Sequence, residues 1–153
     1  MLYILAATGF AGIVGFVLLG VISQRSGNAG LVNGQLRPCP NSPNCVCSLA
    51  ADQEHTIAPI PFSGDAASVI AKIADEVQRL PRTRVVLKTQ DYLHVEFRSA
   101  LFRFVDDVEF LVEPATHQIQ IRSASRVGHS DLGVNRERME QLRRLLEPAL
   151  ANR

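Results

Sequence analysis

The densest group of polar and charged side chains falls in two stretches of the sequence, residues 104–110 and 121–136. If these stretches pair as a hairpin through a turn at 114–117, carboxylates, hydroxyls and arginines meet at one end of a sheet. A glycine-containing loop then leads into a helix, whose N-terminal N–H groups suit an anion. The candidate ligand-binding residues are Asp106, Asp107, Arg122, Ser123, Ser125, Arg126, Gly128, Ser130, Asp131, Asn135 and Arg136.

The same groups have a second interpretation, in which they satisfy one another and bind no ligand. Either Asp106 or Asp107 then pairs with an arginine, Arg126 or Arg136. The serines bond to the backbone, and Asn135 caps the helix. The sequence leaves both interpretations open.

If these two stretches form the active site of an enzyme, it needs an acid or a base. The clustered candidates are Asp106, Asp107 and His129. A Ser-His-Asp hydrolase built from residues 129–131 is disfavoured, because adjacent residues point apart and no G-x-S-x-G segment is present. We therefore expect a binding or accessory module, with a hydrolase-like enzyme as the alternative, and we assign no catalytic residue.

Two of the three cysteines lie in a stiff loop. Prolines within residues 38–43 fix the backbone around Cys39 and Cys45, so that their sulfurs can meet in a disulfide. A metal site would need these two with Cys47 and His55, in a spacing that matches structural zinc poorly, and there is no C-x-x-C-H segment for haem. We therefore predict a disulfide, an inert thiol at Cys47, and neither a metal nor another cofactor.

The N-terminal residues 1–22 contain no charged side chain. As a helix they would extend about 33 Å, enough to cross a hydrocarbon core of about 30 Å. We predict a single transmembrane helix here, followed by a flexible Gly- and Asn-containing linker over residues 23–36. A cleaved signal peptide ending before Gly30 is the alternative, but no basic residue precedes the apolar run.

Two features of the sequence indicate on which side of the membrane the domain lies. Arg25 and Arg37 follow the apolar run, and by the positive-inside rule they favour a cytoplasmic domain. A disulfide persists only in an oxidising compartment, which favours the periplasmic or lumenal side, and we adopt this second prediction. The expected partners are the membrane, a membrane-protein complex, or an anionic small molecule or lipid headgroup. The nearly balanced charge, 16 basic against 15 acidic residues, argues against nucleic acid.

Residues 37–153 are expected to form one α+β domain in the order β-α-β-β-β-β-α. Asp65 is the N-cap of an amphipathic helix that ends before Pro81, and a second amphipathic helix follows Asn135. The expected strands cover residues 55–62, 84–89, 92–99, 105–113 and 118–125. The helices cover the apolar face of the antiparallel sheet, and the other face carries a solvated ladder of charges in which Glu109 lies near Arg122.

This element order resembles half of a TATA-binding-protein-like fold and the helix-grip fold. The chain also resembles the bacterial and plastid family known as domain of unknown function fourteen-ninety-nine. That resemblance rests on CPNSPNC at 39–45, FVDDVEF at 104–110, RSASRVG at 122–128 and SDLGVNR at 130–136. It covers about residues 38–146 and implies no established activity. The family usually has serine where this chain has Cys47, which leaves Cys39 and Cys45 as the pair.

Overall fold

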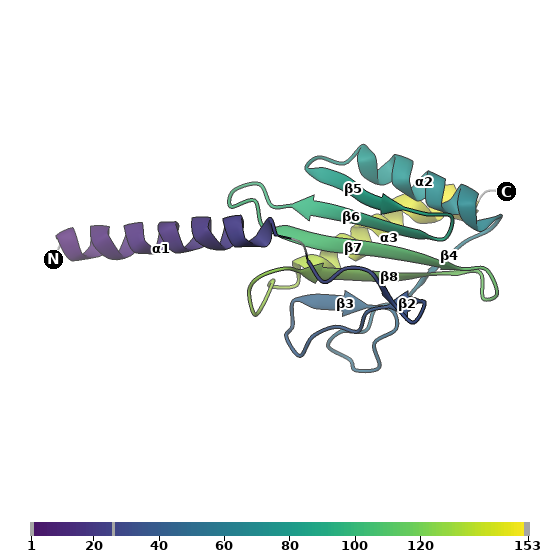
Figure 1. The fold of residues 1–153 in the computed structure, drawn as a ribbon, viewed down its shortest axis with the longest axis horizontal. Helices are drawn as coiled ribbons and strands as arrows, with labels where there is room; N and C mark the ends of the chain where they lie inside the picture. Colours follow the sequence, from purple (N-terminus) through teal and green to yellow (C-terminus); the bar gives the residue numbers. More distant parts are fainter. Residues whose placement is uncertain (1, 26, 152–153) are drawn as a thin grey trace.

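The computed structural model describes residues 2–25 and 27–151, with the side chains of the first helix described from Gly12 onward. Figure 1 shows the helices and strands in these ranges. The helices are α1 (Leu2–Ser23), α2 (Ala66–Gln78) and α3 (Val134–Ala151). The strands are β1 (Leu31–Val32), β2 (Gln35–Leu36), β3 (Cys45–Cys47), β4 (Ile60–Pro61), β5 (Thr83–Lys88), β6 (Tyr92–Arg98), β7 (Val105–Glu113) and β8 (Gln118–Ser125).

One antiparallel sheet forms the centre of the domain. Its strands lie in the order β3-β8-β7-β6-β5, and β4 pairs with the other end of β8. The predicted α+β class is confirmed, and so is the register of the last hairpin. Asp106 lies opposite Ser125, and Glu109 lies opposite Arg122. Strand β3 was not predicted, because three residues are too few to show an alternating pattern.

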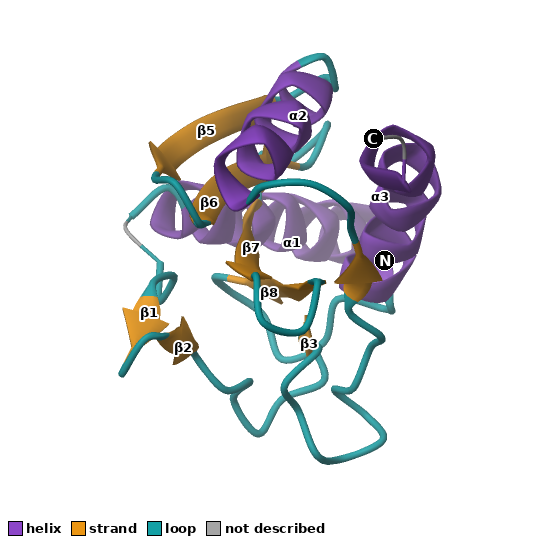
Figure 2. Cartoon of the chain, turned by 90° about the vertical axis from the view of Figure 1, so that its right-hand side faces the viewer, coloured by secondary structure: helices purple, strands orange, loops and turns teal. Residues whose placement is uncertain are grey.

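Helices α2 and α3 cover one face of the sheet, as Figure 2 shows. The sequence sets the start of α2, because the carboxylate of Asp65 accepts the N–H of Ser68 at 3.0 Å, as predicted for its N-cap. The buried core joins the apolar sides of both helices to one face of the strands. It includes Val69, Ile70, Ile73, Val77, Leu93, Val95, Val108, Phe110, Ile119, Ile121, Met139, Leu142, Leu146 and Leu150.

The predicted linker carries regular structure over part of its length. Residues 31–36 form the hairpin of β1 and β2, in which Asn33 and Gly34 have φ angles of +52° and +80°. Two central residues with positive φ are typical of the two-residue turn that fits a twisted hairpin. Figure 2 shows this hairpin on the side of the sheet opposite α2 and α3. The segment between α1 and the domain therefore forms part of a second layer.

Helix α1 leads away from one end of the sheet, beside the β6–β7 and β8–α3 loops (Figure 1). In the part of the chain that the structure describes, we find no helix long and apolar enough to cross a membrane. The transmembrane helix predicted over residues 1–22 is therefore not supported by the structure. Residue 1 and the side chains of residues 2–11 lie outside what is described.

The last turns of α1 approach the β6–β7 loop closely at Gly20. A Cβ atom at this position would lie 2.1 Å from the carbonyl oxygen of Phe102. One turn and a half earlier, a Cβ at Gly15 would meet no atom within 4 Å. Phe16 adds a stacked ring contact to Phe102 at a centroid distance of 5.0 Å. The absence of a side chain at Gly20 thus lets α1 pack against the domain.

We predict that Gly20→Ala separates α1 from the β6–β7 loop, because the new methyl group overlaps a backbone atom. The cost of such overpacking is about 1–3 kcal/mol. Gly15→Ala is the matched control and is expected to be neutral or slightly stabilising, because alanine favours helix. Thermal unfolding of the full chain measures both. Equal melting temperatures for the two variants would contradict the close contact at Gly20.

Candidate functional site

A buried ion network occupies the outer face of the sheet, the face turned away from α2 and α3. Arg126, just after β8, donates from Nε to Oδ2 of Asp107 at 2.9 Å and from Nη2 to Oδ1 at 2.7 Å. Nη2 also donates to Oε1 of Glu96 at 2.7 Å. The three side chains are only 3–6% exposed. A network buried to this degree requires accurate geometry, because each unpaired charge would be costly.

The same guanidinium binds the N-terminal segment. Nη1 of Arg126 donates to the carbonyl oxygens of Ser23 at 3.3 Å and Arg25 at 2.8 Å. Ser23 is the last residue of α1 and Arg25 follows two residues later, so the cation lies at the C-terminal end of the helix, where the helix dipole favours it. Two residues after Arg25, the backbone of Gly27 lies directly against the Asp107–Arg126 ion pair. A Cβ atom at Gly27 would lie 2.0 Å from Oδ2 of Asp107. Arg126 therefore connects the sheet to the end of α1 and the segment that follows.

Further side chains complete the network at its edges. Arg84 donates two hydrogen bonds to Glu96, at 2.9 and 3.0 Å, and His94 bonds to Asp107 at 2.7 Å. Burial alone would raise the pKa of Glu96, but the bonds from Arg84 and Arg126 outweigh it and lower this pKa to about 2. At Asp107, burial alone would likewise raise the pKa. The bonds from His94 and Arg126 outweigh burial, and the pKa of Asp107 is lowered. Both carboxyl groups are therefore ionised at neutral pH.

A second buried pair lies beside the first. Glu109 accepts from Nη1 of Arg122 at 2.6 Å, from the hydroxyl of Tyr92 at 2.7 Å and from the backbone N–H of Gly30 at 2.7 Å. Burial, followed by the bond to Glu109, raises the pKa of Tyr92. The predicted solvated charge ladder is wrong, although its register is right. The segment with β1 and β2 covers Glu109 and Arg122, and both are almost completely buried.

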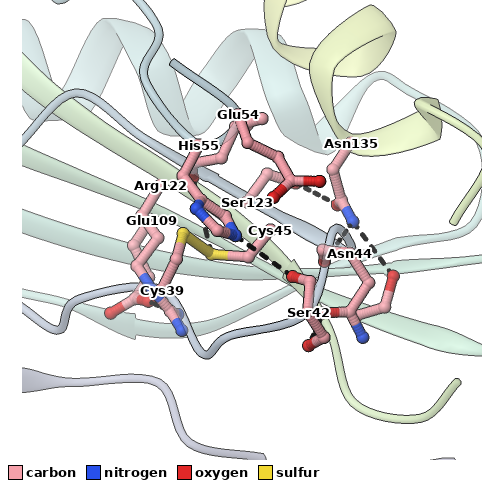
Figure 3. Close-up of a disulfide and its surroundings, with 12 residues drawn as sticks. Cys39, Ser42, Asn44, Cys45, Glu54, His55, Glu109, Arg122, Ser123 and Asn135 are labelled. Carbon is pink, nitrogen blue, oxygen red and sulfur yellow. Dashed lines mark hydrogen bonds and ion pairs between the residues drawn. A yellow bond between two sulfur atoms is a disulfide. The ribbon is translucent and has the colours of Figure 1, made fainter. Parts of the chain in front are cut away.

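The disulfide between Cys39 and Cys45 is present, as predicted, with a Cα–Cα distance of 5.7 Å. Figure 3 shows it beside Glu109 and Arg122. Cys47 is a buried free thiol, and burial raises its pKa. His55 bonds to Asp52 at 2.7 Å and to the carbonyl of Ser42 at 3.2 Å. Among the residues described, no three metal-ligating side chains form a cluster.

The structure separates the two aspartates of the predicted site. Successive residues of a strand point to opposite faces, so Asp106 lies on the helix side and Asp107 on the outer side. Asp106 pairs with Arg138 of α3, while Asp107 pairs with Arg126. His129 lies in the exposed loop between β8 and α3. Each carboxylate is thus held by an arginine.

Asn135 does not cap α3, in contrast to the prediction from the sequence. The carboxylate of Asp131 accepts the N–H groups of Gly133 at 3.0 Å and Asn135 at 2.7 Å. The buried side chain of Asn135 accepts from the hydroxyl of Ser123 at 2.5 Å and donates to that of Ser125 at 3.0 Å. The N–H groups at which we expected an anion therefore already bind a carboxylate of the chain.

Two further predicted site residues, Gly128 and Arg136, bond to the loops around the disulfide, whereas the hydroxyl of Ser130 accepts the N–H of Leu132 within its own loop. Arg136 donates to the carbonyl oxygens of Glu54 at 2.8 Å and Thr56 at 2.7 Å. The carbonyl of Gly128 accepts from the side chain of Asn44 at 2.6 Å. These bonds fasten the β8–α3 connection to the segment that carries the disulfide.

Two cavities adjoin the predicted residues. The larger, of about 570 Å³, lies between the N-terminal segment and the outer face of the sheet. Its lining includes Asp107, Arg122, Ser125 and Arg126 from the prediction, with Ile22, Arg25, Gly27, Arg37, Pro38 and Cys39. The smaller, of about 240 Å³, lies against α1 and is lined in part by Phe16, Leu19, Phe104, Asp106, Ser125, Gly128, Ser130 and Asp131.

Sequence reasoning missed Arg25 and Arg37 as site residues. Both were considered only as signals of membrane orientation. No local motif marks them, because they become part of a site only when the N-terminal segment folds back over the sheet. The signal that was available is their position on either side of a glycine-rich segment that joins an apolar helix to a constrained loop.

A family model described as "Protein of unknown function (DUF1499)" matches residues 35–146. The chain belongs to this family. The matched range includes the disulfide loop, the whole six-stranded sheet and most of α3, so the family assignment covers the folded domain. No curated protein and no solved structure matches the chain. The likeness to TATA-binding-protein-like and helix-grip folds therefore stays a prediction.

We predict that part of the acid sensitivity of this domain originates at Glu96. Its pKa in the folded state is about 2, against an ordinary value of 4.5. The stabilisation is therefore present above about pH 4.5 and is lost as the pH falls towards about 2, by up to about 3 kcal/mol.

Urea unfolding at a series of pH values measures this effect. Glu96→Gln should flatten the decline of unfolding free energy between about pH 5 and pH 2. Asp75→Asn is the control, because this carboxylate is exposed on α2. The assignment to Glu96 fails if both variants keep the slope of the unmodified chain.

Proposed function

We propose that this chain is a membrane-anchored binding or accessory module. The observation that carries the proposal is the surface of α1. No charged residue precedes Arg25, and the described apolar side chains of α1 are largely exposed. They are Ile13, Val14, Phe16, Val17, Leu18, Leu19, Val21 and Ile22. A helix that is apolar all round is stable only when protein or lipid covers it.

The loops beside α1 support the same proposal. Leu101 in the β6–β7 loop is 79% exposed, and Leu132 in the β8–α3 loop is 94% exposed. Leu132 also has a φ angle of +57°, which is unusual for leucine. Isolated exposed leucines need no explanation, but these two lie at the end of the domain from which the apolar helix leaves. A lipid surface would cover all three features together.

The charged residues favour binding over catalysis. The alternative function, a hydrolase-like enzyme, would use Asp106, Asp107 and His129. A catalytic acid or base is typically poised near neutral pH in an open cleft. Asp106 and Asp107 lie on opposite faces of a strand, each is paired with an arginine, and the pKa of Asp107 is lowered. We therefore do not propose a hydrolase-like activity for these residues.

We further propose that the domain lies on the periplasmic or lumenal side, because the Cys39–Cys45 disulfide needs an oxidising compartment. Two kinds of partner fit a module of this design. A membrane-protein complex would use the exposed surface of α1. An anionic small molecule or lipid headgroup would use the domain.

The absence of tryptophan from the chain permits a direct test of the anchor. Single tryptophans at Val17 of α1, at Leu101 and at Leu132 would be examined in vesicles whose lipids carry bromine, a fluorescence quencher, on the acyl chains. We predict strong quenching for Val17→Trp, because α1 lies in the bilayer, and weaker quenching for Leu101→Trp and Leu132→Trp at the interface.

Leu87→Trp is the matched control. This side chain is also exposed, but it lies on β5 near the end of the sheet that is remote from α1. It is expected to show no quenching by brominated lipid. Val17→Trp fluorescence that is as insensitive to bromine as that of Leu87→Trp would refute the membrane anchor.

A further inference from the structure

We propose that the larger cavity is a binding site for a phosphate group, held by Arg25, Arg37 and Arg122. This inference rests on the anionic ligand of the proposed function and deepens it by naming the ligand class and the residues that hold it. The cavity, of about 570 Å³, is within the range of small-ligand sites. Its walls come from two distant parts of the chain, residues 22–25 and 27–40 on one side and the outer face of β7 and β8 with the residues just after β8 on the other.

The first support is the state of Arg25 and Arg37. Neither guanidinium makes a hydrogen bond or an ion pair with any residue that the structure describes, although both residues line the cavity. The carboxylates nearby are already used, because Asp107 binds Arg126 and Glu109 binds Arg122. Both residues are exposed to solvent, and their two positive charges at the cavity have no carboxylate partner among the described residues.

The second, independent support is Arg122. This residue is 3% exposed, and its Nη1 donates to Glu109. Its Nε is buried and has no hydrogen-bond partner. A buried donor without an acceptor costs about 1–3 kcal/mol, and more for a charged group. Because Arg122 lines the cavity, an anion bound there would supply the missing acceptor once the atoms that cover Nε move aside.

Two other charged residues of the cavity, Asp107 and Arg126, hold the site in place and do not bind the ligand. All three nitrogens of the Arg126 guanidinium donate to Asp107, Glu96 or the carbonyls that end α1. Arg37 is next to Pro38 and the disulfide at Cys39, which limits the motion of that wall. The walls of the cavity at Arg126 and at Pro38 and Cys39 are therefore fixed before any ligand arrives.

The arginines favour phosphate over a single carboxylate. A guanidinium fork pairs with two oxygens of an anion, and phosphate offers several oxygens to guanidinium groups that approach from different sides. Two unpaired positive charges match a phosphate monoester, which carries about two negative charges at neutral pH, and exceed the single negative charge of a diester. Because Ile22 of α1 also lines the cavity, the phosphate of a lipid headgroup and a free phosphate are the two sources to be distinguished.

The test is a binding titration of the full chain in a zwitterionic detergent without phosphate. One arm uses inorganic phosphate, and the other uses short-chain phosphatidylglycerol. The variants are Arg25→Gln and Arg37→Gln, whose side chains have no hydrogen bond or ion pair to a described residue to lose. Arg144→Gln, an exposed arginine of α3 outside the cavity, is the matched control.

We expect each cavity variant to weaken binding about tenfold, which corresponds to about 1.4 kcal/mol, with the control within about twofold. An arginine-dependent response to inorganic phosphate supports the site with a free phosphate as its ligand. The same dependence with phosphatidylglycerol alone supports it with a lipid headgroup.

Binding of neither probe would overturn the proposal, and so would equal weakening by Arg144→Gln, which would indicate unspecific attraction. Because detergent replaces the bilayer here, the result does not depend on the membrane anchor. The tryptophan experiment can fail while this one succeeds, and the reverse also holds.

Discussion

The structure depends on one buried guanidinium. Arg126 binds two carboxylates of the sheet and two carbonyl oxygens at the end of α1, so it fixes where the N-terminal segment leaves the helix. Transferring these charges out of water is costly, and such networks add less stability than their number of bonds indicates. What the network provides is a defined path for the chain. Residues 23–25 and 27–39 lie on the outer face, where Arg126 and Glu109 bind their backbone and the absence of a side chain at Gly27 leaves room for Asp107.

This path of the chain makes both the proposed membrane contact and the proposed phosphate site possible. With the segment in place, Arg25 and Arg37 face a cavity with Arg122, and the disulfide restrains one wall. The same end of the sheet orients α1, because Gly20 and Phe16 pack on Phe102. The proposed membrane contact and the proposed phosphate site therefore share one structural origin. A phosphate at the cavity would lie beside the end of α1, where lipid headgroups are expected if α1 is embedded.

The sequence predicted the helices, the long strands and the hairpin register, because these follow from local patterns. Alternation over β6 to β8 identified the apolar face, and Asp65 marked the start of α2. The burial of the polar face was not predictable in this way. Alternation only separates apolar from polar residues, so Glu109 and Arg122 looked solvated. Their cover comes from Gly30, 79 residues before Glu109 in the chain, in a segment whose composition is typical of a linker. Asn135 was wrongly predicted to cap α3. The carboxylate of Asp131 accepts the N–H of Asn135 instead, and the side chain of Asn135 accepts a hydrogen bond from Ser123.

The most direct measurement of this arrangement is amide hydrogen exchange at Gly30 in the full chain at neutral pH. The Gly30 N–H donates to a carboxylate buried under the segment itself, at 2.7 Å. We predict that it exchanges orders of magnitude more slowly than an unstructured glycine, and that it opens together with the sheet. Exchange of Gly30 at the rate of a free peptide would show that the segment is a flexible tether. The outer face would then be open, and the cavity between it and the segment would not exist.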